Sequence, residues 1–475
     1  MAANFLHGVE TIEVSRGARP INVVKSAVIG IVGCAPTGPV NSPTLLLSDR
    51  DAAVFGPEVR GWYSLTEALT TIYGYGNVTV IAVNVLDPAI HRTQEPSATL
   101  TFSADNDRGM LRGGLSNLVL TYEGKALKEG KDYEANLLTG HCQRLPNGSI
   151  PVGATVNASY YYADYKKVDS SDIIGKVEAS GRRTGLQLLA DTYNDFGFCA
   201  KILVIPSYTN YTPNAQALQA MASKIGAVAY IDAPTGTLFS DALKGRGPSG
   251  INNFNTSHPR TMLCYPNVKM AHRVSGGVTL SPLSTHAAAL RATVDQNEGF
   301  WYSTSNHELV GVLGLERPLS ARIDDPQSEV NLLNEKGITT VFSSYGTGLR
   351  LWGNRTAAFP IEADMKTFEA VRRTADIINE SIRYASLPFI DKPLTPALFT
   401  SIIESVNAFG RKLEGDGAVL GFKAWMNKDR NPPIELSKGH LLVSYKFTPP
   451  PALERLSYES EITDEYLVKI TSLGE

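Results

Sequence analysis

The segment from Ala200 to Ile231 constrains the fold most, because it combines a strand, a helix and a second strand in close succession. Ala200 to Ile205 is an apolar run typical of a strand that is buried on both faces. Thr212 precedes a proline and an apolar stripe with helical spacing, so we expect it to cap a helix. Gly226 should end that helix before a second buried strand from Ala227 to Ile231. Such a unit predicts parallel strands joined by a right-handed crossover, and therefore an α/β fold.

A second group of strong local signals lies between Asn331 and Thr356. A short helix should begin this stretch and end at Gly337, since glycine favours the left-handed backbone conformation at helix ends. Ile338 to Phe342 is then rich in β-branched residues, and Leu349 to Trp352 is the expected returning strand after a glycine-containing turn. The segment therefore predicts a core hairpin.

Further elements of the same core are expected on both sides of these segments. The expected strands are Ser26 to Val32, Val78 to Val85, Arg260 to Tyr265, Ala418 to Met426 and His440 to Thr448. The expected helices are Leu65 to Tyr73, Thr285 to Val294, Met365 to Ala385 and one that begins at Thr395.

The residue composition and the hydrophobic pattern differ from the rest of the chain between about His91 and Lys176. Glycine, asparagine and aspartate recur there between short alternating runs such as Leu118 to Tyr122. The last run, Val156 to Asp164, carries several tyrosines, for which packing in a core is a better explanation than stacking on nucleic acid. The region is predicted to be a small all-β module.

Both ends of the chain carry apolar residues that have no evident partner in their own chain. At the start, Val9 to Val14 alternates apolar and polar residues before Gly17 and Pro20 interrupt the pattern. At the other end, apolar residues continue beyond the three prolines that end at Pro451. The candidate strand residues are Val9, Thr11, Ile12, Val14, Leu456, Tyr458 and Ile462.

Length and charge restrict the possible roles. A chain of 475 residues predicts two or three domains, and a net charge of −3 provides no general attraction to nucleic acid or to an anionic membrane. The beginning of the chain lacks the pattern of a secretory signal, and no apolar run is long enough for a membrane span. The four cysteines form no Cys-x-x-Cys pair, which favours buried reduced thiols over metal ligands or disulfides.

Three short segments partly match motifs for catalysis or for binding a cofactor or anion, and each is better explained by a structural role. Gly245 to Gly250 matches G-x-G-x-x-G as a string, but it follows an expected helix instead of a strand, so we expect a plain loop. His307-Glu308 lacks the second histidine of a zinc motif, and Asp324-Asp325 is better explained by helix capping than by paired-carboxylate catalysis. Arg355 is expected to bond backbone carbonyls in the core, with anion binding as the weaker alternative.

The hairpin region resembles the contractile-tail sheath proteins of tailed phages and phage-tail-like particles, including R-type bacteriocins. That family has a segment of the form N-x-L-N-x-x-G-I, followed by a glycine turn and W-G-N/A-R-T. The matching residues here are Asn331, Leu333, Asn334, Gly337, Ile338, Trp352, Gly353, Asn354, Arg355 and Thr356. Gly299 to Asn306 and Gly311 to Leu315 resemble two further family segments, although Thr304 stands where proline is common. Ile29 to Gly33 resembles the family's opening strand.

The resemblance implies a mixed α/β sheath core with an inserted all-β module and terminal arms that exchange strands between subunits. The corresponding divisions are an N-terminal arm at 1–20, a first part of the core at 21–90, the insertion at 91–176, the second part of the core at 177–448 and a C-terminal arm at 449–475. The orphan strands at the two ends are what strand exchange requires.

The implied function is structural and uses no cofactor. Hexameric rings would stack helically around a tail tube and contract, which would drive the tube through the host envelope. The implied partners are other copies of the chain, the tube protein, and the baseplate and tail terminator proteins, with neither nucleic acid nor membrane insertion. The protein would be assembled in the bacterial cytoplasm and reside in the virion tail. The candidate tube contacts are Arg372, Arg373 and Arg383, on the helix that resembles the tube-facing one.

Two alternatives remain open from the residues themselves. Parallel strand-helix repeats also occur in α/β enzymes that bind nucleotides, although the fold class alone is weak support for a function and no phosphate loop is recognisable. The other alternative is a different tail or baseplate component with the same core.

Overall fold

An eight-stranded sheet lies at the centre of the computed structural model, which describes residues 21–58, 62–246, 250, 252–271, 277–346 and 348–471. Its strand order is β18 (Gly348–Trp352), β17 (Ile338–Ser344), β13 (Thr261–Cys264), β12 (Val228–Asp232), β11 (Ile202–Val204), β1 (Val28–Gly33), β3 (Thr79–Asn84) and β2 (Thr44–Leu46). The strands from β17 to β3 are parallel, whereas β18 and β2 pair antiparallel at the two edges. The predicted α/β fold is therefore confirmed.

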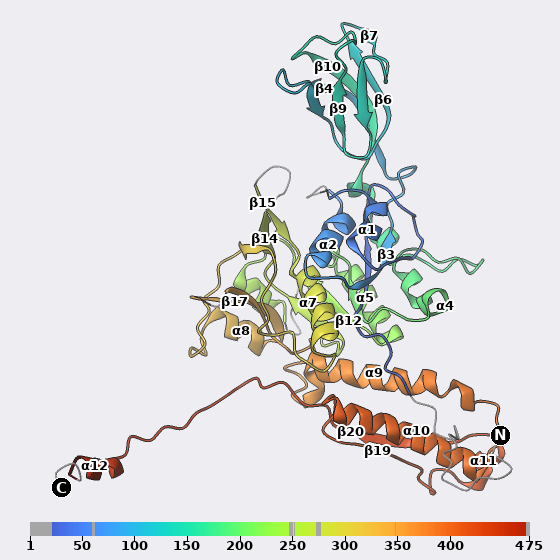
Figure 1. The fold of residues 1–475 in the computed structure, drawn as a ribbon, viewed down its shortest axis with the longest axis vertical. Helices are drawn as coiled ribbons and strands as arrows, with labels where there is room; N and C mark the ends of the chain where they lie inside the picture. The colour runs from blue at the N-terminus through green and yellow to red at the C-terminus, as the bar shows by residue number, and fades with distance from the viewer. Residues whose placement is uncertain are drawn as a thin grey trace, which may run out of the picture.

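Helices cover both faces of this sheet (Figure 1). Helices α2 (Ser64–Tyr73) and α7 (Leu283–Asn297) pack on one face, and α5 (Thr212–Ile225) packs on the other. Gly226 ends α5 with a φ of 64°, as expected, but Thr212 does not cap it. Tyr211 occupies the cap position without a side-chain hydrogen bond, and Thr212 is already the first helical residue.

An all-β module projects from one end of the core and has a hydrophobic cluster of its own (Figure 1). Its strands are β4 (Arg92–Thr101), β5 (Arg108–Met110), β6 (Leu115–Tyr122), β7 (Lys125–Ala126), β8 (Tyr133–Asn136), β9 (His141–Arg144) and β10 (Thr155–Ala163). The pairing of Arg92 with Ala163 brings the two ends of the module together. Val168 and Ile173 pack into the central core instead, so Lys176 lies beyond the end of the module.

A helical unit lies across the amino ends of the parallel strands. It contains α9 (Glu369–Ala385), α10 (Pro396–Gly415), the short helix α11 (Pro433–Ser437), and the two-stranded sheet of β19 (Phe422–Trp425) and β20 (Ser444–Phe447). Ile378 of α9 packs with Val406 and Phe409 of α10 in a separate hydrophobic cluster. The expected helix over 365–385 is divided, since the 3-10 turn η4 (Met365–Thr367) precedes α9.

Short elements complete the chain. They are α1 (Asp49–Ala52), η1 (Ala53–Phe55), η2 (Tyr165–Lys167), α3 (Ser170–Ile174), η3 (Gly185–Ala190), α4 (Thr192–Phe196), α6 (Phe239–Lys244), β14 (Val268–Ala271), β15 (Val278–Ser281), β16 (Val312–Leu315), α8 (Glu329–Glu335), η5 (Leu387–Phe389), η6 (Glu465–Leu467) and α12 (Val468–Thr471). Asp325 accepts a hydrogen bond from the backbone of Gln327 in a turn, and Ser328 occupies the cap position of α8, so the expected helix cap at Asp324-Asp325 is wrong.

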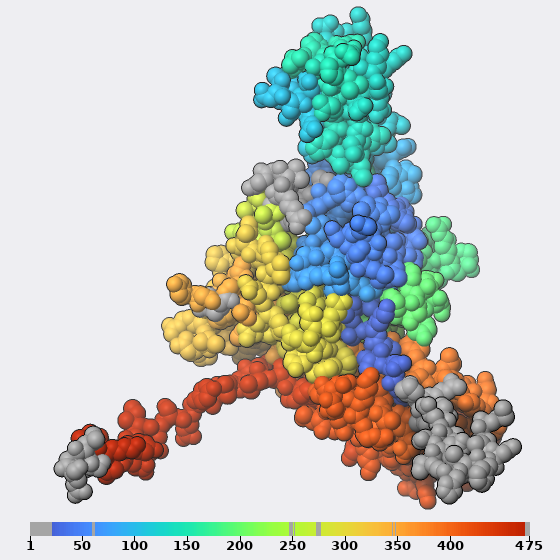
Figure 2. Space-filling model, viewed as in Figure 1, coloured from blue at the N-terminus to red at the C-terminus, as the bar shows by residue number. Residues whose placement is uncertain are grey.

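The segment after β20 leaves the body of the protein. From Pro450 it runs as an extended chain to η6 and α12, and Figure 2 shows the outer part of this segment standing away from the body. We refer to residues 450–471 as the C-terminal arm. Its large apolar side chains are exposed, including Tyr458 at 87% and Ile462 at 103%. An arm of this composition leaves apolar surface in water that a partner can cover.

Candidate functional site at the root of the C-terminal arm

The hairpin of β17 and β18 is held to the end of α8 by the side chain of Asn334. Its amide nitrogen donates to the carbonyl oxygens of Ile338, at 3.1 Å, and Trp352, at 3.2 Å. One side chain therefore bridges the beginning of one strand and the end of the other. Thr356, the last residue of the motif, is buried, whereas Asn331, the first, is exposed. The side-chain amide of Asn331 donates to the carbonyl oxygen of Pro326 at 2.7 Å.

Two motif glycines permit close backbone packing beside Asn334. Gly337 has a φ of 70°, and a Cβ atom there would lie 2.6 Å from the carbonyl oxygen of Phe359. Gly353 has a φ of 129°, and its Cβ would lie 2.9 Å from the Cα of Thr339. Any side chain at either position would need the neighbouring backbone to move, which explains why these positions require glycine.

Arg355 follows this hairpin and contacts the root of the C-terminal arm. Its guanidinium makes two parallel bonds to the carboxylate of Glu454, with Nε–Oε1 at 3.1 Å and Nη2–Oε2 at 2.6 Å. Nη1 donates to Thr367 Oγ1 at 2.7 Å. The guanidinium also lies over the rings of Phe368 and Phe359, at 3.5 and 5.0 Å from their centroids. A bidentate, stacked arginine fixes both the position and the orientation of its carboxylate partner.

The bound carboxylate lies in a cleft built from the family motif. The cleft is lined by Asn334, Gly337, Ile338, Thr339, Gly353, Asn354, Arg355 and Glu454. The motif residues thus converge on the point at which the arm leaves the body. Sequence reasoning missed Glu454, because its partner lies 99 residues away and no local pattern marks an exposed glutamate after a run of prolines.

Another arginine makes most of the backbone bonds that were expected of Arg355. Arg246 donates to the backbone carbonyls of Lys336 (2.8 Å), Phe254 (3.0 Å), Ala357 (2.7 Å) and Phe359 (2.8 Å), and also to that of Thr256. The arginine that bonds core carbonyls is therefore Arg246, from the string that resembled a phosphate loop. Arg355 itself donates to one backbone carbonyl, that of Asp364 at 3.5 Å, and its two parallel bonds are to a carboxylate, the kind of anionic partner that was considered the weaker alternative.

The charged face of α9 is turned toward the core. Four residues spaced by four, three and four positions form one stripe: Glu369, Arg373, Asp376 and Glu380, all buried. Asp376 receives two bonds from Arg260, at 2.9 and 2.7 Å, and Glu380 lies 2.5 Å from Lys201 Nζ. Since Lys201 and Arg260 directly precede β11 and β13, this stripe fixes α9 to the amino ends of the sheet.

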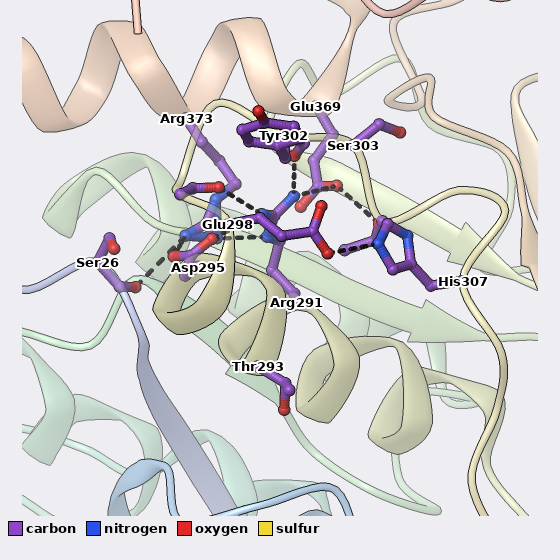
Figure 3. A network of polar contacts seen from close by, with 12 residues as sticks. Ser26, Arg291, Thr293, Asp295, Glu298, Tyr302, Ser303, His307, Glu369 and Arg373 are labelled. Carbon is purple, nitrogen blue, oxygen red and sulfur yellow. Dashed lines mark hydrogen bonds and ion pairs between the residues drawn. The ribbon is translucent and has the colours of Figure 1, made fainter. Parts of the chain in front are cut away.

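Figure 3 shows the start of this stripe, where Arg373 meets α7. Arg373 forms an ion pair with Asp295, whose carboxylate also accepts from Arg291 Nε at 2.8 Å. Arg291 donates to the carbonyl of Tyr302 at 2.7 Å and lies 3.8 Å from Glu369. Each buried charge has an opposite charge beside it, whereas Nε and Nη1 of Arg373 have no hydrogen-bond partner among the described residues.

The three candidate tube contacts therefore lie in different environments. Arg373 is 2% exposed and is not accessible to a partner in this conformation, which corrects its assignment. Arg372 is partly exposed and bonds Asp376 at 3.0 Å. Arg383, near the end of α9, is exposed.

The candidate exchange strands lie at the two ends of the chain. Val9, Thr11, Ile12 and Val14 lie outside the described residues. Leu456, Tyr458 and Ile462 lie in the arm and are exposed, and they form no strand within the described chain.

The small sheet of β19 and β20 offers one open edge. The outward amides of β19 are occupied by α10, because Phe422 N donates to Glu414 at 2.5 Å and Ala424 N to Asn407 at 2.8 Å. Alternation along an antiparallel ladder turns the amides of the opposite residues, Tyr445 and Phe447, outward as well. Within the described residues, no backbone partner covers this outer edge of β20.

A cavity of about 560 Å³ lies beside the amino end of α2 and the loop after β11. The strand order reverses between β1 and β11, and α/β enzymes bind ligands at such points. Trp62, Tyr208 and Tyr211 line the cavity. The Tyr208 hydroxyl lies 3.0 Å from Cys34 Sγ, and burial raises the pKa of Cys34 to about 12, which keeps it a neutral thiol without nucleophilic character.

The helices in the described part of the chain are too short or too polar to cross a membrane. No cluster of three or more His, Cys, Asp or Glu side chains in the same residues is arranged to hold a metal ion.

Comparison with known proteins agrees with these observations. Residues 181–357 match the family model of the phage tail sheath protein central domain, and residues 363–463 match the phage tail sheath C-terminal domain. The tail sheath protein of Burkholderia phage BcepMu is 56% identical over 474 residues, with 99% of each chain covered. The tail sheath protein of Escherichia phage P2 is 25% identical and covers 99% of this chain and 98% of its own.

A solved structure supports the same fold at low sequence identity. The helical sheath of the anti-feeding prophage in its contracted state superposes with a TM-score of 0.60 at 16% identity, covering 98% of this chain and all of the other. The motif residues are thus placed in a fold that a distant sheath protein shares, and the relative that is 56% identical covers 99% of the chain. The chain belongs to the phage tail sheath protein family.

Proposed function

We propose that this protein is the sheath subunit of a contractile phage tail, polymerising as stacked hexameric rings around a tail tube. The observation that carries the proposal is the C-terminal arm, which leaves the body at a built anchor and exposes its apolar side chains. A strand of this kind gains main-chain hydrogen bonds and apolar burial only from another molecule. Head-to-tail contacts that do not close generate filaments, as a sheath requires.

The acceptor for an arm is the outer edge of β20. Each main-chain hydrogen bond contributes about 0.5–1.5 kcal/mol, so a single exchanged strand is modest on its own. Many arms joined through folded bodies act together through effective concentration. The N-terminal segment from Val9 to Val14 is the second exchange strand in this proposal.

The partner inside the sheath is the tube protein, and the proposed contacts are Arg372 and Arg383 on α9. Arg383 lies on the exposed side of the helix, whereas the side chain of Arg373 is buried in the core. The rings end at baseplate and terminator proteins, and assembly takes place in the bacterial cytoplasm before the particle is complete. Contraction releases conformational energy, without catalytic turnover or a cofactor.

Deletion of Met1 to Gly17 tests the exchange of strands. The variant should keep the unfolding temperature of the monomer within a few degrees and lose long tubes. Thermal unfolding and negative-stain microscopy on the same sample provide the readout. Normal contractile tubes from the truncated protein would refute the role of the N-terminal arm.

A further inference from the structure

We infer that Arg355 and Glu454 form a latch that fixes where the C-terminal arm leaves its own subunit, and thereby sets how far the arm reaches. The inference rests on the proposed exchange of arms between subunits. It assigns a role to a pair of side chains that joins the family motif to the arm.

The Arg355 half of the latch is preorganised by residues that do not belong to the arm. Its side chain is 13% exposed and is held by the Thr367 hydroxyl and the ring of Phe368, both next to the start of α9. Backbone bonds fix the same junction, since Thr356 N donates to the carbonyl of Thr367 at 2.7 Å. The guanidinium is therefore oriented before a carboxylate arrives, so little entropy is lost when it binds.

The Glu454 half belongs to a segment that is otherwise extended and exposed. Its side chain is 45% exposed, so the pair lies at the surface and can open without unfolding the body. On the amino-terminal side, Thr448 is bonded to the body, with its N–H donating to the carbonyl of Gly421 at 3.1 Å. The latch thus moves the origin of the arm from Thr448 to Glu454.

This shift changes the effective concentration of the exchange strand. Leu456, the first candidate strand residue, lies two positions after Glu454, the anchor when the latch is closed, and eight positions after Thr448, the anchor when it is open. Effective concentration falls with about the −3/2 power of linker length, so opening costs about eightfold. When the Arg355–Glu454 pair is closed, a force that pulls on the arm acts on the junction of β18 and α9. When the pair is open, the same force acts on the small sheet of β19 and β20.

Assembly of the full-length protein provides the first test. Glu454→Gln removes the charge at nearly constant size, and Glu454→Lys adds repulsion. Both should raise the critical concentration for tube formation, by roughly eightfold for the glutamine variant and by more for the lysine variant. Glu465→Gln and Glu465→Lys are the matched controls, because Glu465 is an exposed carboxylate of the same arm and lies beyond the proposed exchange strand. Equal critical concentrations for the Glu454 and Glu465 variants would overturn the latch.

A distance measurement on the monomer separates the latch from the proposed function. Spin labels at Ala363→Cys and Ser457→Cys, both exposed positions, span the pair from its two sides. A narrow distance distribution is expected in the otherwise native protein, broadening in Glu454→Gln but not in Glu465→Gln. A broad distribution in all three would overturn the latch even if tubes form. A narrow one that broadens only in Glu454→Gln would support it even if the wild type forms no tubes.

Discussion

The charged stripe of α9 gives a quantitative prediction about how the helical unit is held to the sheet. Lys201 and Glu380 are 3% and 9% exposed and 2.5 Å apart. In Lys201→Met the methionine fills a similar volume but leaves the Glu380 carboxylate buried without its cation. Breaking a buried pair in this way costs about 3–5 kcal/mol. The double variant Lys201→Met/Glu380→Met removes both charges and should lie within about 1 kcal/mol of the wild type, since apolar replacement of a whole pair is often neutral or stabilising.

Hydrogen exchange of the α9 amides is the assay, because it reports local opening of this helix. At about 1.4 kcal/mol for each tenfold, the single variant should lose roughly 100-fold or more in protection. The matched control is Lys438→Met, which breaks the pair with Glu435 at 2.8 Å, where the side chains are 55% and 39% exposed. That control should change stability by less than about 1 kcal/mol. A double variant as damaged as the single one, or an unaffected single variant, would refute the stripe as a buried ionic contact.

Three further predictions concern the β module, a buried acid and the surface of α9. Replacing 92–163 by a short Gly/Ser linker should leave a soluble core with a cooperative unfolding transition by circular dichroism, because Arg92 and Ala163 are paired neighbours; insoluble protein would show that the core depends on the module. Burial raises the pKa of Asp232 from 3.8 to about 6, so its contribution to stability is greatest below pH 4 and declines as the pH rises to 6. The free energy of unfolding of the wild type, relative to that of Asp232→Asn, should therefore fall by up to about 3 kcal/mol between pH 4 and pH 7. A difference in urea unfolding that stays constant with pH would contradict this. Changing Arg372 and Arg383 to glutamate should weaken co-sedimentation with the tube protein while sheath-only polymers persist, and unchanged tube binding would remove α9 from the interface.

The sheet could be predicted from the sequence because its signals are local. Apolar runs such as Ala200 to Ile205 correspond to strands buried on both faces, and Gly226 and Gly337 end helices where the backbone needs a positive φ. The all-β module was visible for the same reason, since its turn residues recur at short intervals. Its end was misplaced because Val168 and Ile173 are apolar residues of the central core that continue directly from the module's last strand.

The orientation of α9 could not be predicted, because the helix is buried on two faces. Its apolar face could be recognised from the helical spacing of the apolar residues. The charged residues have the same spacing, and in the sequence a buried charged stripe looks the same as a charged face in contact with solvent. The partners that bury it, Lys201, Arg260 and Asp295, come from three distant segments. The same holds for Arg355, whose role depends on a carboxylate 99 residues later. Charge pairing across long separations requires the tertiary structure.

The central claim is that subunits are joined by exchanged arms. Helical reconstruction by cryo-electron microscopy of tubes formed by the full-length protein tests it most directly. We expect density for Leu456 to Ile462 of one subunit to run beside Ser444 to Phe447 of a neighbour, at the strand spacing of about 4.8 Å. Arms that fold back onto their own subunit, or compact particles without tubes under all assembly conditions, would contradict the account.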